Sequence, residues 1–295
     1  MKGFIKFIAR KSKENWAFYR LYRLLDSAGV LSSVKGKFLV QDSNGKSYYL
    51  FNQPFNLESE IYWQGIDNID WEKTTRKIWT MLCERSHLIL DIGANSGIFS
   101  VMAKAYNPTS IVYAFEPQPN IFSVLAKNNQ INNFDLICNN IALSNMEGKF
   151  PFYNYGKNTF TRDNTTAGSL NKEWRKGRQQ SILVDVKTLD TYIKENSVPR
   201  IDLIKIDVET LEYEVLQGYM NFLHVHRPII ILEVLNVQVG RRIESLFSGH
   251  NYLYYHINEN EGAVLVSSLG SGLNGNNYII CPIEKRPSKW PIDDY

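Results

Sequence analysis

The chain has 295 residues, of which 44% are hydrophobic and 21% are charged, and its formal net charge is only +3. These values are typical of one large globular domain or two small ones, and they do not favour nucleic acid as a partner. The sequence has no apolar run of about 18 residues, no apolar signal-peptide core at its start and only three widely spaced cysteines. We therefore expect a cytoplasmic protein without membrane-spanning helices, a disulfide framework or a zinc motif.

The first 25 residues are strongly basic, with seven lysine and arginine side chains against one acid, Glu14. Apolar residues recur among them at near-helical spacing, as in Phe4, Ile5, Phe7 and Ile8. This pattern predicts a basic amphipathic helix. One interpretation is peripheral contact of residues 1–25 with an anionic membrane surface. The other is that the helix packs on its own domain or on a partner subunit.

The next elements precede the main domain. Residues 37–41 and 47–51 are β-type runs on either side of Asn44-Gly45, which predicts a hairpin. Residues 69–84 predict a helix whose inner face carries Trp71, Ile78, Trp79 and Leu82. We assign residues 1–60 to an N-terminal accessory extension, made of the helix and the hairpin, residues 61–283 to the main domain and residues 284–295 to an irregular tail.

A short apolar run at residues 88–90 ends in Asp91, and a small-residue turn at 93–97 leads into a helical pattern. Such a strand, turn and helix form a nucleotide-type cradle, in which glycine lets the backbone approach a ligand. The dinucleotide and phosphate-loop motifs are both absent. S-adenosylmethionine carries an ammonium group and no phosphate, so an acidic strand end suits it better. The candidate cofactor-binding residues here are Asp91, Gly93, Ala94, Asn95 and Gly97.

A second acid follows the next predicted strand, residues 110–115, at Glu116. An acid at this point is placed to accept both ribose hydroxyls of a nucleotide-like ligand. The alternative is an ordinary cap for the helix predicted at residues 120–129. A third strand at 134–138 leads to Asn140 and Ala142. Predicted strands at 149–153 and 182–186 then enclose a long polar insert, which is either a flap on the substrate side or a disordered segment.

Two further predicted strands also end in acids. Residues 201–206 lead into Asp207-Val208-Glu209, and residues 228–232 lead into Glu233. The last predicted strands are 252–256, which ends in His256, and 277–281. Because ligands of open α/β sheets bind at the carboxyl ends of the strands, we expect the four strand-end acids to surround one site. Their alternatives are helix caps for Asp207 and Glu209, a salt bridge for Glu233 and a turn or core role for His256.

Three segments together resemble the FkbM-type methyltransferases, from about residue 61 to residue 281. They are Asp91-Ile-Gly-Ala-Asn-Ser-Gly-Ile-Phe-Ser100, Ala114-Phe-Glu-Pro-Gln-Pro119 and Ile201-Asp-Leu-Ile-Lys-Ile-Asp-Val-Glu209. The resemblance implies a class I, Rossmann-like α/β fold: a seven-stranded, mostly parallel sheet with helices on both faces and an antiparallel last hairpin. It also implies S-adenosylmethionine as cofactor, with its adenine beside Asn140 and Ala142. The chain departs from the family pattern at Thr210, where a glycine is usual.

The function implied by the resemblance is O-methylation of a sugar hydroxyl, on a glycan or a glycosylated metabolite. A weakly acidic hydroxyl needs a base, for which the candidates are Asp207, Glu209, Glu233 and His256. The same acids are of the type that binds Mg²⁺, and their spacing does not distinguish a metal site from a base, so the use of a metal stays open and we assign no metal ligand. The alternatives are transfer to nitrogen or to a non-sugar natural product, a nicotinamide-dependent oxidoreductase, or a non-catalytic binding module. The sequence leaves the oligomeric state open.

Overall fold

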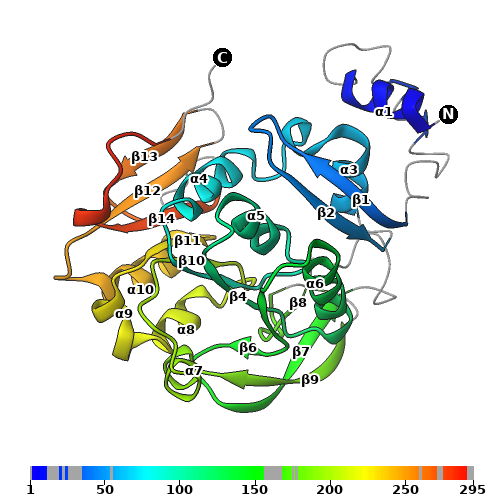
Figure 1. Ribbon diagram of the computed structural model, residues 1–295. Coiled ribbons are helices and arrows are strands. Elements are labelled where there is room, and N and C mark those ends of the chain that lie inside the picture. Colours follow the sequence, from blue (N-terminus) through cyan, green and yellow to red (C-terminus); the bar gives the residue numbers. More distant parts are fainter. Residues whose placement is uncertain are drawn as a thin grey trace.

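An eight-stranded sheet forms the centre of the computed structural model, with strand order β13-β12-β14-β11-β10-β3-β4-β5 (Figure 1). The structure describes residues 2–11, 20–21, 24–25, 35–53, 56–155, 168–174, 176, 179–258, 261–270 and 275–290. The sheet consists of β3 (Leu88–Ile92), β4 (Ile111–Phe115), β5 (Ile137–Asn139), β10 (Leu203–Ile206), β11 (Ile229–Glu233), β12 (Tyr252–Asn258), β13 (Gly262–Val266) and β14 (Asn277–Pro282).

The five strands β11, β10, β3, β4 and β5 are parallel, and β14 pairs antiparallel with both β11 and β12. The seven predicted strands and the class I order are therefore confirmed. The structure adds an eighth strand, β13, which forms a hairpin with β12 at the edge of the sheet. The parallel arrangement brings the carboxyl ends of four acid-bearing strands to one side of the sheet.

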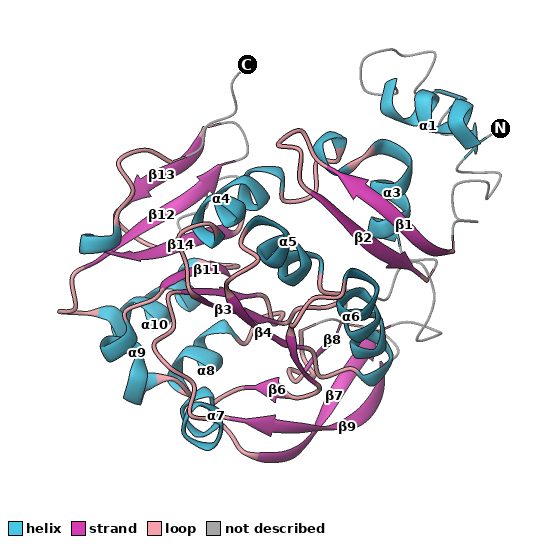
Figure 2. Ribbon diagram, in the orientation of Figure 1, coloured by secondary structure: helices cyan, strands magenta, loops and turns pink. Residues whose placement is uncertain are grey.

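Helices cover both faces of this sheet, so the molecule has three layers (Figure 2). One face carries α4 (Lys73–Cys83), α5 (Ile98–Tyr106) and α6 (Pro119–Asn132), and the other carries α7 (Leu189–Asn196), α8 (Glu212–Gln217), α9 (Met220–His226) and α10 (Val237–Phe247). Alternate strand residues enter different cores: Ile89 packs with the α4 and α5 side chains, whereas Leu88 and Leu90 pack with those of α7 to α10.

The N-terminal hairpin is present as predicted, with β1 (Gly36–Gln41) paired to β2 (Ser47–Asn52). It is followed by α3 (Asn56–Gln64) and the short η2 (Ile66–Asn68). Its inward side chains Val40, Tyr48 and Leu50 join the same core as Trp79 of α4. On its outer edge, the Phe51 N–H donates to Asn128 Oδ1 on α6 at 2.7 Å. The hairpin thus extends the core of the main sheet.

The basic N-terminus forms α1 (Lys2–Lys11), which packs against α3 and buries Ile5 and Ile8. Its side chains Phe4 and Phe7 are 65% and 51% exposed. Much of the helix predicted over residues 1–25 lies outside the described residues. Within the described part of the chain, no helix is long and apolar enough to cross a membrane.

A second, four-stranded sheet lies beyond the carboxyl end of β5, in the order β6-β9-β7-β8. It consists of β6 (Ala142–Leu143), β7 (Gly148–Tyr155), β8 (Gly168–Ser169) and β9 (Gln179–Lys187). The two strands predicted around the polar insert are β7 and β9, which pair antiparallel. Residues 156–167 of the insert lie outside the described residues. After β14 the chain forms η3 (Ile283–Lys285), and Trp290 packs on Tyr255.

Candidate active site

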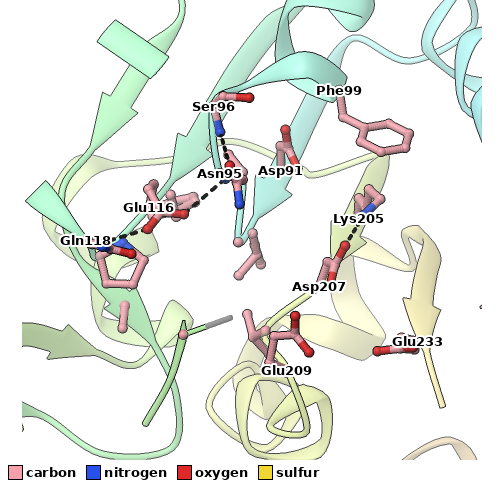
Figure 3. A pocket seen from close by; sticks show the side chains of 18 of the residues that line it. Asp91, Asn95, Ser96, Phe99, Glu116, Gln118, Lys205, Asp207, Glu209 and Glu233 are labelled. Atoms are coloured by element: carbon pink, nitrogen blue, oxygen red, sulfur yellow. Dashed lines mark hydrogen bonds and ion pairs between the residues drawn. The ribbon is translucent and has the colours of Figure 1, made fainter. Parts of the chain in front are cut away.

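A cavity of about 550 Å³ lies at the carboxyl ends of β3, β4, β10 and β11. Most of the predicted site residues line it: Asp91, Gly93, Ala94, Asn95, Glu116, Ala142, Asp207, Glu209 and Glu233. Figure 3 shows Glu116 and Asn95 on one side of the cavity, and Asp207, Glu209 and Glu233 on the other. Three predicted residues, Gly97, Asn140 and His256, lie outside the set of described residues that line it.

The turn after β3 depends on glycine at its first position. Gly93 has a φ of 81°, and a Cβ atom there would lie 1.9 Å from the Asp207 carbonyl oxygen. The backbone N–H groups of Gly93 and Ala94 both donate to the Phe115 carbonyl, at 3.0 and 2.9 Å. Any side chain at position 93 would therefore push apart the two strand ends that form the cavity.

The rest of the turn is shaped by side-chain hydrogen bonds. Asn95 has a left-handed φ of 52°, and its Oδ1 accepts from the Ser96 N–H at 2.7 Å. Asn128 of α6 donates from Nδ2 to the Ser96 carbonyl at 2.8 Å. Gly97 does not line the cavity, but a Cβ there would lie 2.4 Å from Leu125 Cδ1, so this glycine lets α5 begin close to α6.

Glu116 is held in place by two backbone donors. Its Oε2 accepts from the Asn95 N–H at 3.0 Å, and its Oε1 accepts from the Gln118 N–H at 2.9 Å. Each carboxylate oxygen has further acceptor capacity, as a ribose diol requires. Burial raises the pKa of Glu116 to about 7. Asn140 donates to the Glu116 and Pro117 carbonyls at 2.8 and 3.0 Å. It therefore fixes the backbone of this loop without lining the cavity itself.

Asp91 is the other buried acid on this side, with 2% of its surface exposed. Ser100 Oγ donates to its Oδ2 at 2.5 Å. Burial raises the pKa of Asp91, and the nearby Lys205 ammonium partly counters that rise. A cationic ligand group in the cavity would stabilise the charged form of this carboxylate.

The residues on this side fit S-adenosylmethionine. Asp91 would take the ammonium group and Glu116 the ribose hydroxyls, and both side chains are buried and face the cavity. The apolar Pro117, Ile141 and Leu143 line the same end, where a flat adenine ring needs a nonpolar surface.

The opposite side is organised by Lys205, which lies in an otherwise apolar strand. Its Nζ donates to Asp207 Oδ2 at 2.7 Å, lies 3.9 Å from Glu72 Oε2 and sits 4.4 Å from the centre of the Phe99 ring. Burial alone would lower the pKa of Lys205, but Asp207, Glu72 and Asp91 raise it above its ordinary value. The lysine therefore stays charged and fixes the Asp207 carboxylate.

Glu233 and Glu209 complete this side of the cavity. Glu233 Oε1 accepts from Asn276 Nδ2 at 3.3 Å. Burial, and then the neighbouring Asp207 charge, raise the pKa of Glu233. Glu209 follows Asp207 by two residues and has a left-handed φ of 55°. The four predicted strand-end acids and Glu209 thus share one cavity.

His256 has a different environment from these acids. It is 1% exposed, its Nε2 lies 3.2 Å from the Gly275 carbonyl oxygen, and its ring packs 5.1 Å from that of Tyr278. This placement in the core matches the alternative role that the sequence left open for His256.

Several cavity residues were not predicted. Lys205 could have been found, because it is the one charged residue in the strand Leu203–Ile206. Glu58 and Trp71 come from the N-terminal segments and reach the cavity through tertiary packing. Burial raises the pKa of Glu58 to about 7, and a hydrogen bond with Ser96 partly counters that rise. Among the described residues, no group of three or more His, Cys, Asp or Glu side chains is arranged to hold a metal ion.

Comparisons with known proteins identify the family of the chain. The methyltransferase FkbM domain matches residues 91–254. Methyltransferase sdnD of Sordaria araneosa is 28% identical over 200 residues, covering 57% of this chain and 76% of that protein. Hexuronic acid methyltransferase AglP of Haloferax volcanii is 25% identical over 178 residues, covering 60% of this chain and 68% of that protein.

The 2-O-methyltransferase NoeI of Sinorhizobium fredii is 26% identical over 154 residues, covering 50% of this chain and 63% of that protein. A crystal structure of methyltransferase FkbM from Methylobacillus flagellatus KT resembles the chain with a TM-score of 0.41 and 13% identity, covering 66% of this chain and 43% of that one. Since the family domain spans more than half of the 295 residues, the protein belongs to the FkbM family of methyltransferases, and its cofactor is S-adenosylmethionine.

Proposed function

We propose that the protein O-methylates a sugar hydroxyl of a glycan or glycosylated metabolite. The observation that carries the proposal is that Asp207, Glu209 and Glu233 line the end of the cavity opposite Glu116. Carboxylates suit the binding and deprotonation of hydroxyl groups. Two relatives add support, since one is named as a hexuronic acid methyltransferase and another as a 2-O-methyltransferase.

Bound S-adenosylmethionine supplies an electrophilic methyl carbon on a sulfonium sulfur, which leaves as a neutral thioether. The chain's own task is to align the acceptor oxygen with that carbon and to take the hydroxyl proton as the oxygen–carbon bond forms. Glu233 is the proton acceptor in this proposal, because its raised pKa makes its carboxylate more basic than an ordinary one. Asp207 is paired with Lys205, so it serves to accept a hydrogen bond from a neighbouring hydroxyl.

The aromatic side chains at the same end suit a sugar ring. Trp71 and Phe99 both line the cavity, and their rings lie 5.3 Å apart at 58°. Such faces pack against the C–H face of a sugar while its hydroxyls reach the acids. Transfer to nitrogen, or to a hydroxyl of a non-sugar natural product, is the second candidate, because the same carboxylates would also bind an amine.

A labelled-methyl transfer assay tests the proposal. The acceptors would be nucleotide sugars and the surface glycans of the host, each assayed with and without EDTA. We expect label on a sugar oxygen, with equal activity in EDTA. Label on an amine or on a non-sugar product would contradict the sugar hydroxyl. Activity abolished by EDTA and restored by Mg²⁺ would instead assign the three acids to a metal.

A further inference from the structure

The turn that follows β10 has an unusual backbone. Glu209 and Thr210 have φ angles of 55° and 86°. A left-handed conformation is uncommon for any residue with a side chain, and for β-branched threonine it is a rare outlier. Residues held in this way persist only where the surrounding structure fixes them. The sequence at Thr210 is also where the chain departs from the glycine of its family pattern.

Hydrogen bonds hold three consecutive residues of this turn. The Val208 N–H donates to Glu212 Oε1 at 3.2 Å. Ser169 Oγ donates to the Glu209 carbonyl at 2.9 Å, and Asn171 Nδ2 donates to Thr210 Oγ1 at 3.0 Å. Two of these three hydrogen bonds therefore come from residues 169–171, in β8 and directly after it, about 40 residues away in the sequence.

Residues 168–171, which comprise β8 and the two residues after it, form a compact unit. Ser169 Oγ accepts from the backbone N–H of Asn171 at 3.0 Å, which links the two residues that hold the turn. Gly168 and Leu170 line the cavity, whereas Ser169 and Asn171 bond to the turn and lie outside the described lining residues. Alternate residues of this short stretch therefore either line the cavity or hold the turn.

The backbone of Asp207, at the start of the turn, packs closely against β3 and the turn after it. The Asp207 N–H donates to the Ile92 carbonyl at 2.9 Å, and the Asp207 carbonyl lies where a Cβ of Gly93 would be. A change in the φ angles at 209 and 210 would therefore alter the direction of the Glu209 side chain more than the position of Asp207.

We propose that Ser169 and Asn171 are positioning residues that set the direction of the Glu209 carboxylate in the acceptor end of the cavity. Their hydrogen bonds, which come from the second sheet, hold the backbone at positions 209 and 210 in its positive-φ conformation. A glycine at position 210 would adopt such a φ without this support. This inference rests on the proposed function for the acceptor-side role of Glu209. The competing explanation is that the two residues merely stabilise β8.

The test compares Asn171→Ala, Thr210→Val and the double variant Asn171→Ala/Thr210→Gly. We expect each single variant to lower kcat/KM for the acceptor by about 10- to 100-fold, because small misplacements of a reacting group cost this much. The affinity for S-adenosylhomocysteine should stay within about threefold of wild type. The double variant should recover to within about threefold of wild type, because glycine adopts positive φ without strain.

Controls keep the result interpretable. Asn145→Ala removes a surface hydrogen bond to Gln217 Oε1 and should leave activity unchanged. If Asn171→Ala does not fold, Ser169→Ala removes the other anchor and takes its place in the comparison. Hydrogen–deuterium exchange of residues 207–212 needs no acceptor: exchange should rise in Asn171→Ala and fall again when Thr210→Gly is added.

Two outcomes would overturn the inference. One is full activity in both Asn171→Ala and Ser169→Ala. The other is a double variant whose kcat/KM is as low, and whose exchange at residues 207–212 is as fast, as in Asn171→Ala alone. Asn171 would then act by some route other than the backbone at position 210. A wild-type protein that methylates no acceptor would count against the proposed function instead, and the exchange measurement would still decide the role of Asn171.

Discussion

At the scale of single residues, Glu233 is the carboxylate on which the proposed chemistry depends most. Its environment combines partial burial with the negative charge of Asp207, and both raise its pKa. A carboxylate accepts a proton only when ionised, so activity should fall as the pH drops through the raised pKa of Glu233, above its ordinary value of 4.5.

We predict that Glu233→Gln lowers kcat by at least about 100-fold. The residual activity should also lose the acid limb of its pH profile. Profiles of kcat against pH, measured for the variant and the wild type, check both points. Glu214→Gln is a matched control, because Glu214 pairs with Arg242 away from the cavity. An unchanged acid limb in Glu233→Gln would show that the base is a residue other than Glu233.

At the scale of elements, the N-terminal hairpin shares its core with the main sheet. Leu50 is fully buried beside α4 and α5, whereas Leu39 of the same hairpin is 54% exposed. Leu50→Ala should lower the free energy of unfolding by about 2–5 kcal/mol, and Leu39→Ala should change it by less than about 1 kcal/mol. Urea unfolding followed by fluorescence measures both. A separate early transition for the hairpin would show instead that it folds as an independent extension.

The helix α1 has a composition suited to anionic lipid. It carries four basic residues and no acid, and Phe4 and Phe7 are more than half exposed while Ile5 and Ile8 pack inward. We expect the protein to sediment with vesicles that contain phosphatidylserine, less so at high salt and not with neutral vesicles. Phe4→Ser with Phe7→Ser should reduce this binding without changing methyl transfer to a soluble acceptor. Equal binding by the variant would contradict a membrane role for this face.

At the scale of the whole molecule, three buried acids link stability to pH. Burial raises the pKa of Glu58 and Glu116 to about 7 and that of Glu212 to about 8, from a value of 4.5. Because the folded state holds these protons more tightly than the unfolded chain, their contribution to stability is fully present below about pH 4.5. It is lost as the pH rises through about 7 and 8.

The Tm of the ligand-free protein should therefore fall by several degrees between about pH 5 and pH 8, and level off above that. Glu212→Gln should flatten this dependence, because an amide cannot lose a proton. Thermal unfolding followed by circular dichroism across the pH range measures the effect. The exposed Glu84→Gln serves as the control. A Tm that rises steadily over this range would mean that these carboxyls are not buried as described.

Much of this architecture could be predicted from the sequence, and the limits have physical causes. Asp91, Glu116, Asp207 and Glu233 meet because parallel strands place their carboxyl ends on one edge. Local patterns predict the strands, whereas their order in the sheet was implied by the family resemblance. Trp71 and Glu58 reach the same cavity only through the packing of distant segments. The edge strand β13 was missed because its residues 262–266 are short and partly exposed.

The whole reading of the molecule depends on S-adenosylmethionine binding in the cavity between the Gly93 turn and Glu116. Calorimetric titration with the product S-adenosylhomocysteine tests it most directly, with NAD as the comparison ligand. We predict one site for S-adenosylhomocysteine, weakened by about 1–3 kcal/mol in Glu116→Ala, and no binding of NAD. A folded wild-type protein that does not bind S-adenosylhomocysteine, or that binds NAD equally well, would show that this cavity is not an S-adenosylmethionine site.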